Sequence, residues 1–287
     1  MTQMTSPPVL PILTHASAPL TCEVDTVNEY GEQLCMSIPA ERALTVYVDK
    51  RELVTLMTLG AHPELLVLGY LRNQRLVNSP EQIESITVDW DVGAAAVKTR
   101  TGIDDIEEKT ARRVVTTGCG QGSVFGGLMD EVDQLVLPKD IRITQRQLYS
   151  VVNTIRLEET TYKSAGSVHA CALFQLGGDE PKMLLFVEDV GRHNAIDTIA
   201  GWLAMNEITS PGLVFYTTGR LTSEMVIKSA QMGVPIVVSR SGITQMGHQI
   251  AQTVGLCAIG RATNKRFVCY ASPERLQLEP QARVNHG

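Results

Sequence analysis

The residue best suited to covalent chemistry in this sequence is Cys119, which lies in a glycine-rich segment. Residues 116–123 read Thr-Thr-Gly-Cys-Gly-Gln-Gly-Ser and follow a strand-like run at 113–116. Glycine admits backbone conformations closed to other residues and leaves space beside the thiol. A mobile, accessible loop of this kind suits a reactive sulfur that meets two different partners in turn. The alternative is a small apolar cysteine in a tight turn, since free cysteine is usually buried and inert.

A second set of polar residues follows four predicted strands in the second half of the chain. Each connection contains a glycine and an arginine, and the arginines are Arg192, Arg220, Arg240 and Arg261. In an open parallel sheet these connections share the edge at the carboxyl ends of the strands. Helix N-termini and guanidinium groups both bind anions, so the edge predicts a site for a pyrophosphate or nucleotide. The alternative is that the arginines only decorate the surface. Neither a P-loop nor a G-x-G-x-x-G motif is present.

His193 is the one histidine in a polar, glycine-containing connection. It can donate to a phosphate, act as an acid or base, or hold Asp189 in place. A structural histidine that bridges two loops fits the pattern as well. Glu224, at the start of a predicted helix, complements the helix dipole rather than doing chemistry.

The elements that must position these residues are read from periodicity and turn signals. The first half predicts strands at 43–48, 52–59, 83–90 and 94–99 and a buried helix that begins near Pro63 and continues through 64–71. Thr144 and Gln147 match a capping box, which predicts a helix to about residue 157, followed by a loop at 158–166. The second half alternates strands and helices, which indicates a largely parallel sheet with helices on its faces.

The same reading divides the chain into a disordered tail and two domains. The tail is residues 1–19, which are rich in Pro, Thr and Ser. The boundary between the domains is placed at 137–140. An amino-terminal α/β domain then spans 20–140 and carries the Cys119 loop, and a second domain spans 141–287 and carries the arginine-rich edge.

Composition excludes several classes of protein. The 287 residues carry a net charge of −6, which argues against nucleic acid as a partner because phosphate backbones demand a basic surface. No run approaches the roughly 20 apolar residues of a membrane helix, and the start lacks the basic and apolar regions of a signal peptide. We therefore expect a cytoplasmic protein without a membrane partner. The six cysteines lack zinc spacing, and we expect Cys171, Cys257 and Cys269 in the core.

Residues 188–197 read Glu-Asp-Val-Gly-Arg-His-Asn-Ala-Ile-Asp. This run closely resembles the E-D-V-G-R-H-N-A-x-D signature of the FdhD family of formate dehydrogenase accessory sulfurtransferases. The resemblance continues through 168–170, 219–220, 223–228 and 238–240, and covers most of the chain from about residue 20 to 276. It implies an α/β fold with a three-layer carboxy-terminal domain of cytidine-deaminase-like architecture and a smaller amino-terminal α/β domain.

The resemblance also implies a function. Such proteins take sulfur from a cysteine desulfurase as a persulfide. They pass it to the molybdenum or tungsten guanine dinucleotide cofactor, here a bound substrate, which formate dehydrogenase then uses. Cys119 matches the persulfide carrier, and a homodimer is the family-level expectation. The residues predicted to bind the cofactor are Ile259, Gly260, Arg261, Ala262, Thr263, Asn264, Asp189, Arg192, His193, Asn194, Arg220, Arg240 and Thr244, and none is predicted to bind a metal ion.

This sequence departs from the family pattern at three places. Gly122 replaces the second cysteine of a C-G-x-C loop, so no adjacent thiol can resolve a persulfide on Cys119. A proline usual before Thr244 is absent, and Thr198 replaces a usual lysine. Zinc deaminase chemistry is rejected because His169-Ala170-Cys171 lacks the glutamate of an H-x-E motif and no C-x-x-C is present. The rival hypothesis is a non-catalytic chaperone that binds and delivers the cofactor, with Cys119 a relic.

Overall fold

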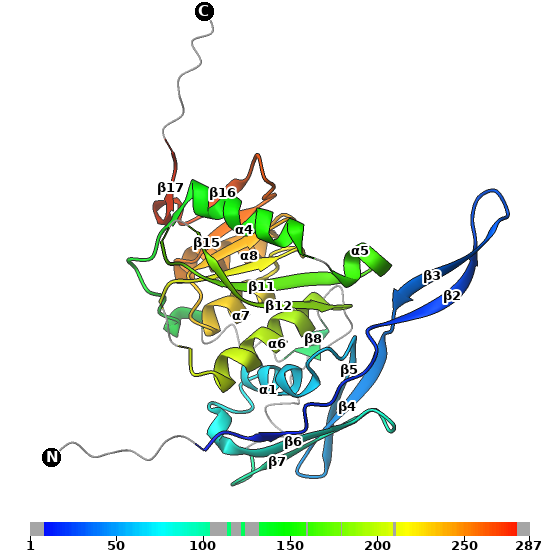
Figure 1. Ribbon diagram of the computed structural model, residues 1–287. Coiled ribbons are helices and arrows are strands. Elements are labelled where there is room, and N and C mark those ends of the chain that lie inside the picture. Colours follow the sequence, from blue (N-terminus) through cyan, green and yellow to red (C-terminus); the bar gives the residue numbers. More distant parts are fainter. Residues whose placement is uncertain are drawn as a thin grey trace, which may run out of the picture. The chain divides into compact units, whose positions relative to one another are not determined.

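The computed structural model describes residues 9–103, 114–115, 122–123, 132–158, 160–178, 180–208 and 211–279 (Figure 1). The chain forms two compact units. Unit 1 contains Met1–Asp130, Thr160–Ala170 and Val187–Ile208, and unit 2 contains Glu131–Glu159, Cys171–Phe186 and Thr209–Gly287. The sequence placed a single boundary near residue 140. The structure instead returns two later segments to unit 1, because a helix from the second half packs against a helix from the first.

A five-stranded sheet forms the base of unit 1. Its order is β1 (Ile12–Leu13), β6 (Ile83–Asp89), β7 (Ala94–Thr99), β4 (Arg42–Val48) and β5 (Arg51–Thr58). The neighbours β4 and β5 are antiparallel, as are β6 and β7, whereas β4 runs parallel to β7. These strands alternate buried and exposed residues as predicted, so one face packs on the core and the other faces water.

Two helices of unit 1 pack closely against each other. They are α1 (Pro63–Asn73) and α6 (Arg192–Met205). A Cβ atom on Gly69 would lie 1.7 Å from the Asp197 carbonyl oxygen, and one on Gly201 would lie 2.0 Å from the Leu65 carbonyl oxygen. Only glycine allows the two backbones to approach this closely. Asn73 Nδ2 donates to Asp197 Oδ1 at 2.7 Å across the same contact.

The prediction that residues 1–19 form a disordered tail is wrong from residue 9 onward. Strand β1 pairs in parallel with β6. The Thr14 hydroxyl and the Ala16 amide both donate to Glu64 Oε1, at 2.6 and 2.7 Å. Glu64 is buried in the first turn of α1, so these two hydrogen bonds satisfy a carboxylate that would otherwise lack partners.

Two further elements of unit 1 were absent from the sequence prediction. Strands β2 (Thr21–Val27) and β3 (Gln33–Pro39) form an antiparallel hairpin that extends beyond the five-stranded sheet (Figure 1). The predicted loop at 158–166 contains the short helix α5 (Thr161–Ala165). Glu188 organises this helix, because its carboxylate accepts the backbone N–H groups of Thr161 at 2.5 Å and Tyr162 at 3.2 Å.

Unit 2 is built on a six-stranded sheet. The strands stand in the order β12 (Lys182–Asp189), β11 (His169–Gln175), β13 (Leu213–Thr217), β14 (Ile236–Ser239), β15 (Cys257–Gly260) and β16 (Val268–Ala271). The central pairs β13–β14 and β14–β15 are parallel, but β11 runs antiparallel to β13 and β16 runs antiparallel to β15. The sheet is therefore mixed, and the prediction of a largely parallel sheet holds only for its centre.

Helix α4 (Gln145–Leu157) covers one face of this sheet, and its buried residues join Phe174, Val214 and Ile236 in one core cluster. Helices α7 (Ser223–Gln231) and α8 (Gln245–Val254) contact each other and lie on the other side (Figure 1). The fold is a mixed α/β fold. The specific likeness to cytidine deaminases stays a prediction. Among the residues that the structure describes, no helix is long and apolar enough to cross a membrane.

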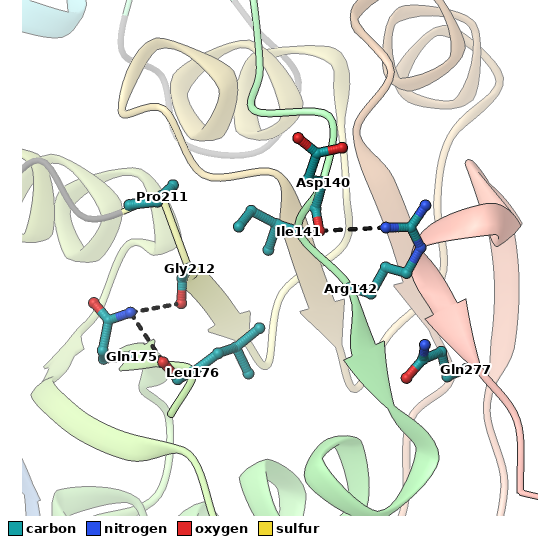
Figure 2. A pocket seen from close by; sticks show the side chains of 8 residues that line it. All are labelled: Asp140, Ile141, Arg142, Gln175, Leu176, Pro211, Gly212 and Gln277. Atoms are coloured by element: carbon teal, nitrogen blue, oxygen red, sulfur yellow. Dashed lines mark hydrogen bonds between the residues drawn. The ribbon is translucent and has the colours of Figure 1, made fainter. Parts of the chain in front are cut away.

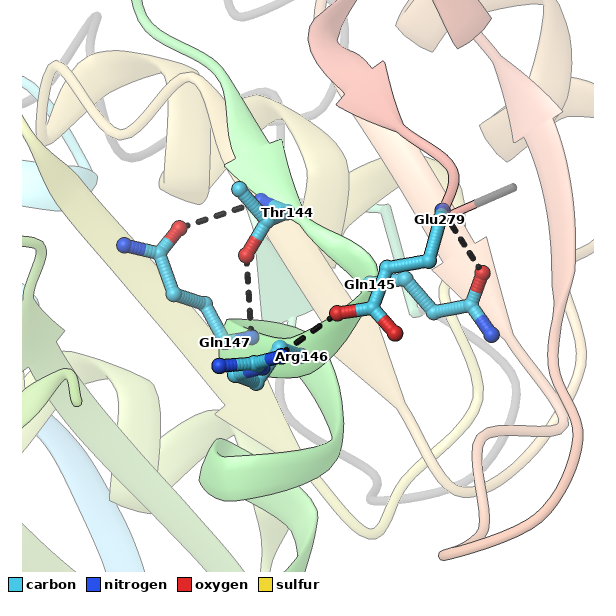
Figure 3. Close-up of polar contacts among 5 residues, drawn as sticks. All are labelled: Thr144, Gln145, Arg146, Gln147 and Glu279. Carbon is cyan, nitrogen blue, oxygen red and sulfur yellow. Dashed lines mark hydrogen bonds and ion pairs between the residues drawn. The ribbon is translucent and has the colours of Figure 1, made fainter. Parts of the chain in front are cut away.

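The helix start at Thr144 is as predicted from sequence. The Thr144 hydroxyl accepts the Gln147 N–H at 3.1 Å, and the Gln147 side chain accepts the Thr144 N–H at 3.0 Å (Figure 3). Arg146 lies 3.3 Å from Glu279, and both side chains are largely exposed. The reciprocal cap satisfies two backbone donors of α4, whereas an exposed ion pair of this kind adds little stability.

Short pieces complete the described chain: β8 (Val114–Val115) with β9 (Gly122–Ser123), β10 (Ile143–Thr144) with β17 (Leu276–Gln277), and 3-10 turns at Pro80–Gln82, Val132–Gln134 and Pro273–Arg275.

Candidate functional site

The signature run at 188–197 forms the end of β12 and the start of α6. Asp189 is the last residue of the strand, Gly191 is the N-cap and Arg192 is the first residue of the helix. Gly191 provides no side-chain cap. The first turn of α6 therefore presents backbone N–H groups and the positive end of the helix dipole, and no side chain in the described part of the protein caps them.

Asp189 organises the backbone around this turn. Its Oδ1 accepts the Gly191 N–H at 3.1 Å and Asn194 Nδ2 at 2.8 Å, and its Oδ2 accepts the Thr58 hydroxyl and the Leu59 N–H. Burial raises the pKa of Asp189 above its ordinary value, and the bonds from Thr58, Gly191, Asn194 and Leu59 partly oppose that rise. Asp189 thus ties the end of β5 to the start of α6. Sequence reasoning missed Thr58, which no local motif marks.

Asn194 belongs to the same network. Its Nδ2 also donates to the Met57 carbonyl oxygen at 2.6 Å. Both hydrogens of the amide are thereby used within the protein, since the other goes to Asp189. These contacts give Asp189 and Asn194 a positioning role. Direct contact of either residue with a ligand stays a prediction.

Arg192 is the exception in this network. Its side chain is 4% exposed, yet its Nε and Nη2 atoms have no hydrogen-bond partner among the residues that the structure describes. Buried guanidinium donors without partners are costly, so native proteins rarely keep them without a reason. An anion at this position would accept the free donors. His193, next to it, is also buried.

In unit 2 the predicted arginines of three loops are all exposed. Arg220 follows β13, Arg240 follows β14 and Arg261 follows β15. The register pairs Thr217 with Ser239, and Val238 with Ile259. The structure therefore brings the three loops together at the carboxyl ends of three adjacent parallel strands, as the sequence predicted.

Two serine hydroxyls hold these loops to one another. Ser239 Oγ donates to the Gly219 carbonyl oxygen at 2.7 Å, and Ser241 Oγ donates to the Thr218 carbonyl oxygen at 3.0 Å. The Arg261 N–H donates to the Ser241 carbonyl oxygen at 2.7 Å. The edge is thus fixed before any ligand arrives, which lowers the entropic cost of binding. The sequence showed both serines but gave no reason to single them out.

The segment at 259–264 combines packing with exposure. Ile259 and Ala262 belong to the core cluster of unit 2, whereas Asn264 is exposed. A Cβ on Gly260 would lie 2.8 Å from both the Ser241 carbonyl oxygen and the Tyr270 ring. Thr263 uses its hydroxyl to donate to the Arg266 carbonyl oxygen at 3.2 Å. Contact of this segment with a ligand would therefore come from Arg261, from Asn264 or from backbone groups.

Two threonines start the helices at this edge. Thr244 caps α8, since its hydroxyl accepts the Gly247 N–H at 3.2 Å. Thr222 is the N-cap of α7 but makes no capping bond, and its buried Oγ1 has no partner within the described part of the chain. Thr222 is therefore, after Arg192, the second residue beside a predicted binding loop with a buried polar atom that lacks a partner in the described structure. Glu224 in the first turn of α7 lies 3.2 Å from Lys228, so it neutralises a buried cation.

Cys119 lies outside the described residues, so its role rests on the sequence. Of the predicted core cysteines, Cys171 and Cys257 are buried and Cys269 is half-buried. The sulfur atoms of Cys257 and Cys269 are 4.0 Å apart, so these two thiols are neighbours as well as core residues. Among the residues that the structure describes, no group of three or more His, Cys, Asp or Glu side chains could hold a metal ion.

A pocket of about 560 Å³ lies at the opposite end of the unit 2 strands (Figure 2). Gln175 and Leu176 lie beside Gly212, at the amino end of β13, and the Gln175 amide donates to the Leu176 and Gly212 carbonyl oxygens. Asp140 and Arg142 contribute exposed charges. The pocket is therefore distinct from the arginine-bearing edge and was not predicted from sequence.

Comparison with known proteins decides the family. The model of the FdhD/NarQ family matches residues 39–277. This chain belongs to the FdhD/NarQ family. It is 30% identical over 238 residues to the sulfur carrier protein FdhD of Bacillus subtilis, covering 83% of this chain and 89% of that protein. It is 28% identical over 241 residues to the sulfur carrier protein FdhD of Staphylococcus haemolyticus, covering 84% and 90%.

A crystal structure shows the same fold. It is that of a chain from Desulfotalea psychrophila assigned as a formate dehydrogenase accessory protein. The TM-score is 0.70 at 22% sequence identity, covering 90% of this chain and all of that one. The family resemblance read from residues 188–197 is thereby confirmed, and the FdhD/NarQ family is the frame for the site described above.

Proposed function

We propose that this FdhD/NarQ family member accepts sulfur from a cysteine desulfurase as a persulfide on Cys119 and transfers it to the molybdenum or tungsten guanine dinucleotide cofactor that formate dehydrogenase uses. The proposal is supported by the relatives, which are named sulfur carrier proteins. The observation that supports ligand binding is the buried guanidinium of Arg192 with its unpartnered donors. We place the reaction in the cytoplasm, where thiols stay reduced.

The loading step is a thiol exchange in the ordinary sense. The Cys119 thiolate attacks the outer sulfur of the desulfurase persulfide, a new S–S bond forms on Cys119, and the desulfurase cysteine leaves as a thiolate. One S–S bond replaces another, so the step needs no oxidant. Because Gly122 stands where the family has a second cysteine, an adjacent thiol cannot trap the persulfide as a disulfide. The sulfur must leave by direct transfer or with help from a distant thiol.

The cofactor is the second substrate, and each unit, taken by itself, carries residues suited to bind a diphosphate. Arg192 offers buried donors at a helix N-terminus in unit 1, where anions bind well. Arg220, Arg240 and Arg261 offer exposed guanidinium groups on loops fixed by the Ser239 and Ser241 bonds in unit 2. Asp189 and Asn194 position the first turn of α6, and we assign His193 to ligand contact or proton transfer in the same turn. The homodimer expected of the family stays a prediction.

Mass spectrometry tests the carrier role directly. The protein is incubated with a cysteine desulfurase and free cysteine, digested without reductant and mapped. We expect the Cys119 peptide to gain one sulfur that reductant removes. The exposed thiols of Cys22 and Cys35 are internal references that should load much less, and the variant Cys119→Ser should not load at that position. An unmodified Cys119, beside a two-cysteine relative that loads, would sink the mechanism.

The second candidate is a chaperone that binds and delivers the cofactor without transferring sulfur. Gly122 is the observation that favours it, because the family's second cysteine is missing. Under this hypothesis Cys119→Ser would support formate dehydrogenase activity as well as the unchanged protein does. Under the carrier hypothesis the variant would still bind the cofactor but would leave the dehydrogenase inactive.

A further inference from the structure

The β2–β3 hairpin has one apolar face. Residues of a strand alternate between faces, and the register places Leu34, Met36 and Ile38 of β3 on the same face as Val24 of β2. The three β3 side chains are 43%, 51% and 39% exposed. They form a contiguous row on an element that extends away from the five-stranded sheet of unit 1 (Figure 1). Contiguous exposed apolar side chains indicate an interaction surface.

The backbone of the hairpin also indicates an interaction surface. Its two strands form a sheet of their own among the described strands, so each strand keeps an unpaired outer edge. A two-stranded hairpin is marginally stable in water unless another surface covers it, and an open edge is a template for further pairing. Neither the apolar row nor the edges are protected by proline or lysine within the two strands, apart from Pro39 at the end of β3.

The charge of the hairpin is entirely negative. The polar face and the turn carry Glu23, Asp25, Glu29 and Glu32, and no lysine or arginine occurs between residues 9 and 41. The next cation along the chain, Arg42, donates to the Pro19 and Leu59 carbonyl oxygens and lies over the Trp90 ring, and helix α5, which contacts β3, carries the cation Lys163. A second copy of the chain would bring the same four carboxylates against these, which is unfavourable. The charge therefore favours a partner with a basic surface.

The hairpin is connected to the signature run through α5. Strand β3 contacts α5, and the carboxylate of Glu188 holds the first turn of α5. Glu188 directly precedes Asp189, which fixes the start of α6 and thus Arg192. Tyr162 of α5 is itself 54% exposed. A protein bound on the hairpin would contact an element anchored on the ligand-binding turn.

We propose that the β2–β3 hairpin is the docking surface for a partner protein whose contact surface is apolar at its centre and rimmed by lysine or arginine. The partner's apolar side chains cover Leu34, Met36 and Ile38, and its cations face the four carboxylates. The identity of the partner rests on the proposed function, which requires a sulfur-donor protein and a formate dehydrogenase to meet this chain.

Binding is measured with two purified probes, the cysteine desulfurase and the formate dehydrogenase of the same organism, at several salt concentrations. The apolar variant is Leu34→Ser with Met36→Ser, and the charge variant is Glu23→Lys with Asp25→Lys. The matched controls change exposed positions elsewhere in unit 1, Val92→Ser and Glu52→Lys. Circular dichroism and melting temperature establish that each variant is folded.

We expect at least one probe to bind the unchanged protein, to lose ten-fold or more in affinity with each hairpin variant, and to lose most of its salt dependence with the charge variant. The control variants should bind normally. The proposal is overturned if neither probe binds or if neither responds to the hairpin variants. It is also overturned if sedimentation shows that the hairpin variants convert a dimer to a monomer, because a second copy then covers the surface.

Loading of Cys119 separates this proposal from the proposed function. At high desulfurase concentration a weak complex still transfers sulfur, so the hairpin variants should load Cys119 fully when enough donor is present. Normal loading together with unchanged affinity would overturn the docking surface alone. Failure of the unchanged protein to load, with binding that still depends on the hairpin, would overturn the sulfur-carrier role alone.

Discussion

At the scale of single residues, Arg192 is the residue with the strongest support for a proposed role in anion binding. Its replacement separates a binding role from a structural one. Arg192→Met removes a buried cation whose Nε and Nη2 lack partners in the described structure. We expect affinity for guanosine diphosphate, as a probe for the guanine dinucleotide, to fall about 10- to 100-fold, because a charged hydrogen bond contributes roughly 1.5–3 kcal/mol. Titration calorimetry measures this loss, and Arg142→Gln, at the opposite end of the strands, is the control.

The melting temperature of the same variant supplies the second readout. Without ligand, loss of a buried cation with two unpartnered donors in the described structure should leave the fold as stable or make it more stable. A large drop in the melting temperature of Arg192→Met, with weaker binding explained by unfolding, would identify Arg192 as a structural residue instead.

Asp189 predicts a pH dependence of stability. Burial raises the pKa of its carboxyl in the folded protein, above the value of about 3.9 expected in the unfolded chain. Its contribution to the free energy of unfolding is therefore present below the unfolded pKa and lost as pH rises through the folded pKa. Urea unfolding from pH 4 upward should show this loss for the unchanged protein and not for Asp189→Asn. Thr58→Val, which removes one opposing bond, should extend the loss to higher pH. Parallel curves for all three would contradict the prediction.

Residue types predicted the candidate site residues better than they predicted the residues that hold the surrounding loops in place. The sequence predicted Arg192, Arg220, Arg240 and Arg261 because glycine and arginine recur after strands. The partners that hold them, such as Thr58 or Ser239, are ordinary residues far away in the chain, and their roles depend on tertiary contacts that no local pattern encodes. The role of Cys119 rests on sequence alone and stays a prediction.

At the scale of elements, the crossing of α1 and α6 is the most sensitive contact in unit 1. Gly69→Ala would place a Cβ 1.7 Å from the Asp197 carbonyl oxygen, so the helices must separate. We expect a loss of about 3 kcal/mol or more in the free energy of unfolding, at the upper end of the cost of overpacking. Gly177→Ala is the control, because its Cβ would meet nothing within 4 Å. Equal denaturation midpoints for the two variants would show that the helices do not pack this closely.

Elements with strong local signals were predicted well, and elements fixed by context were not. The capping box at Thr144 and the proline near the start of α1 are local, and both helices begin as expected. The β2–β3 hairpin and α5 lack such signals. In a half-buried strand the apolar side chains face the core, whereas Leu34, Met36 and Ile38 of β3 are exposed. Helix α5 depends on Glu188, which lies more than twenty residues away in the sequence.

At the scale of the whole molecule, the chain is organised as two units whose segments alternate along the sequence rather than as two consecutive domains. The sequence suggested a boundary near residue 140 from Pro138 and its neighbours. It could not show that Thr160–Ala170 and Val187–Ile208 return to unit 1, because that return depends on packing of α6 against α1. One consequence is that the signature run, with Arg192, belongs to unit 1 together with α1 and the β2–β3 hairpin.

Loading and binding should nevertheless be separable functions of the chain. Cys119→Ala removes the thiol and none of the binding residues, so we expect full affinity for guanosine diphosphate and no sulfur transfer. Arg192→Met removes the proposed ligand contact and not the thiol, so we expect a normal Cys119 persulfide and impaired delivery to the cofactor. An equal mixture of the two variants tests whether the functions must reside in one chain. Restored formate dehydrogenase activity would show that sulfur passes between copies, and failure to restore it would show that each copy loads and delivers its own sulfur.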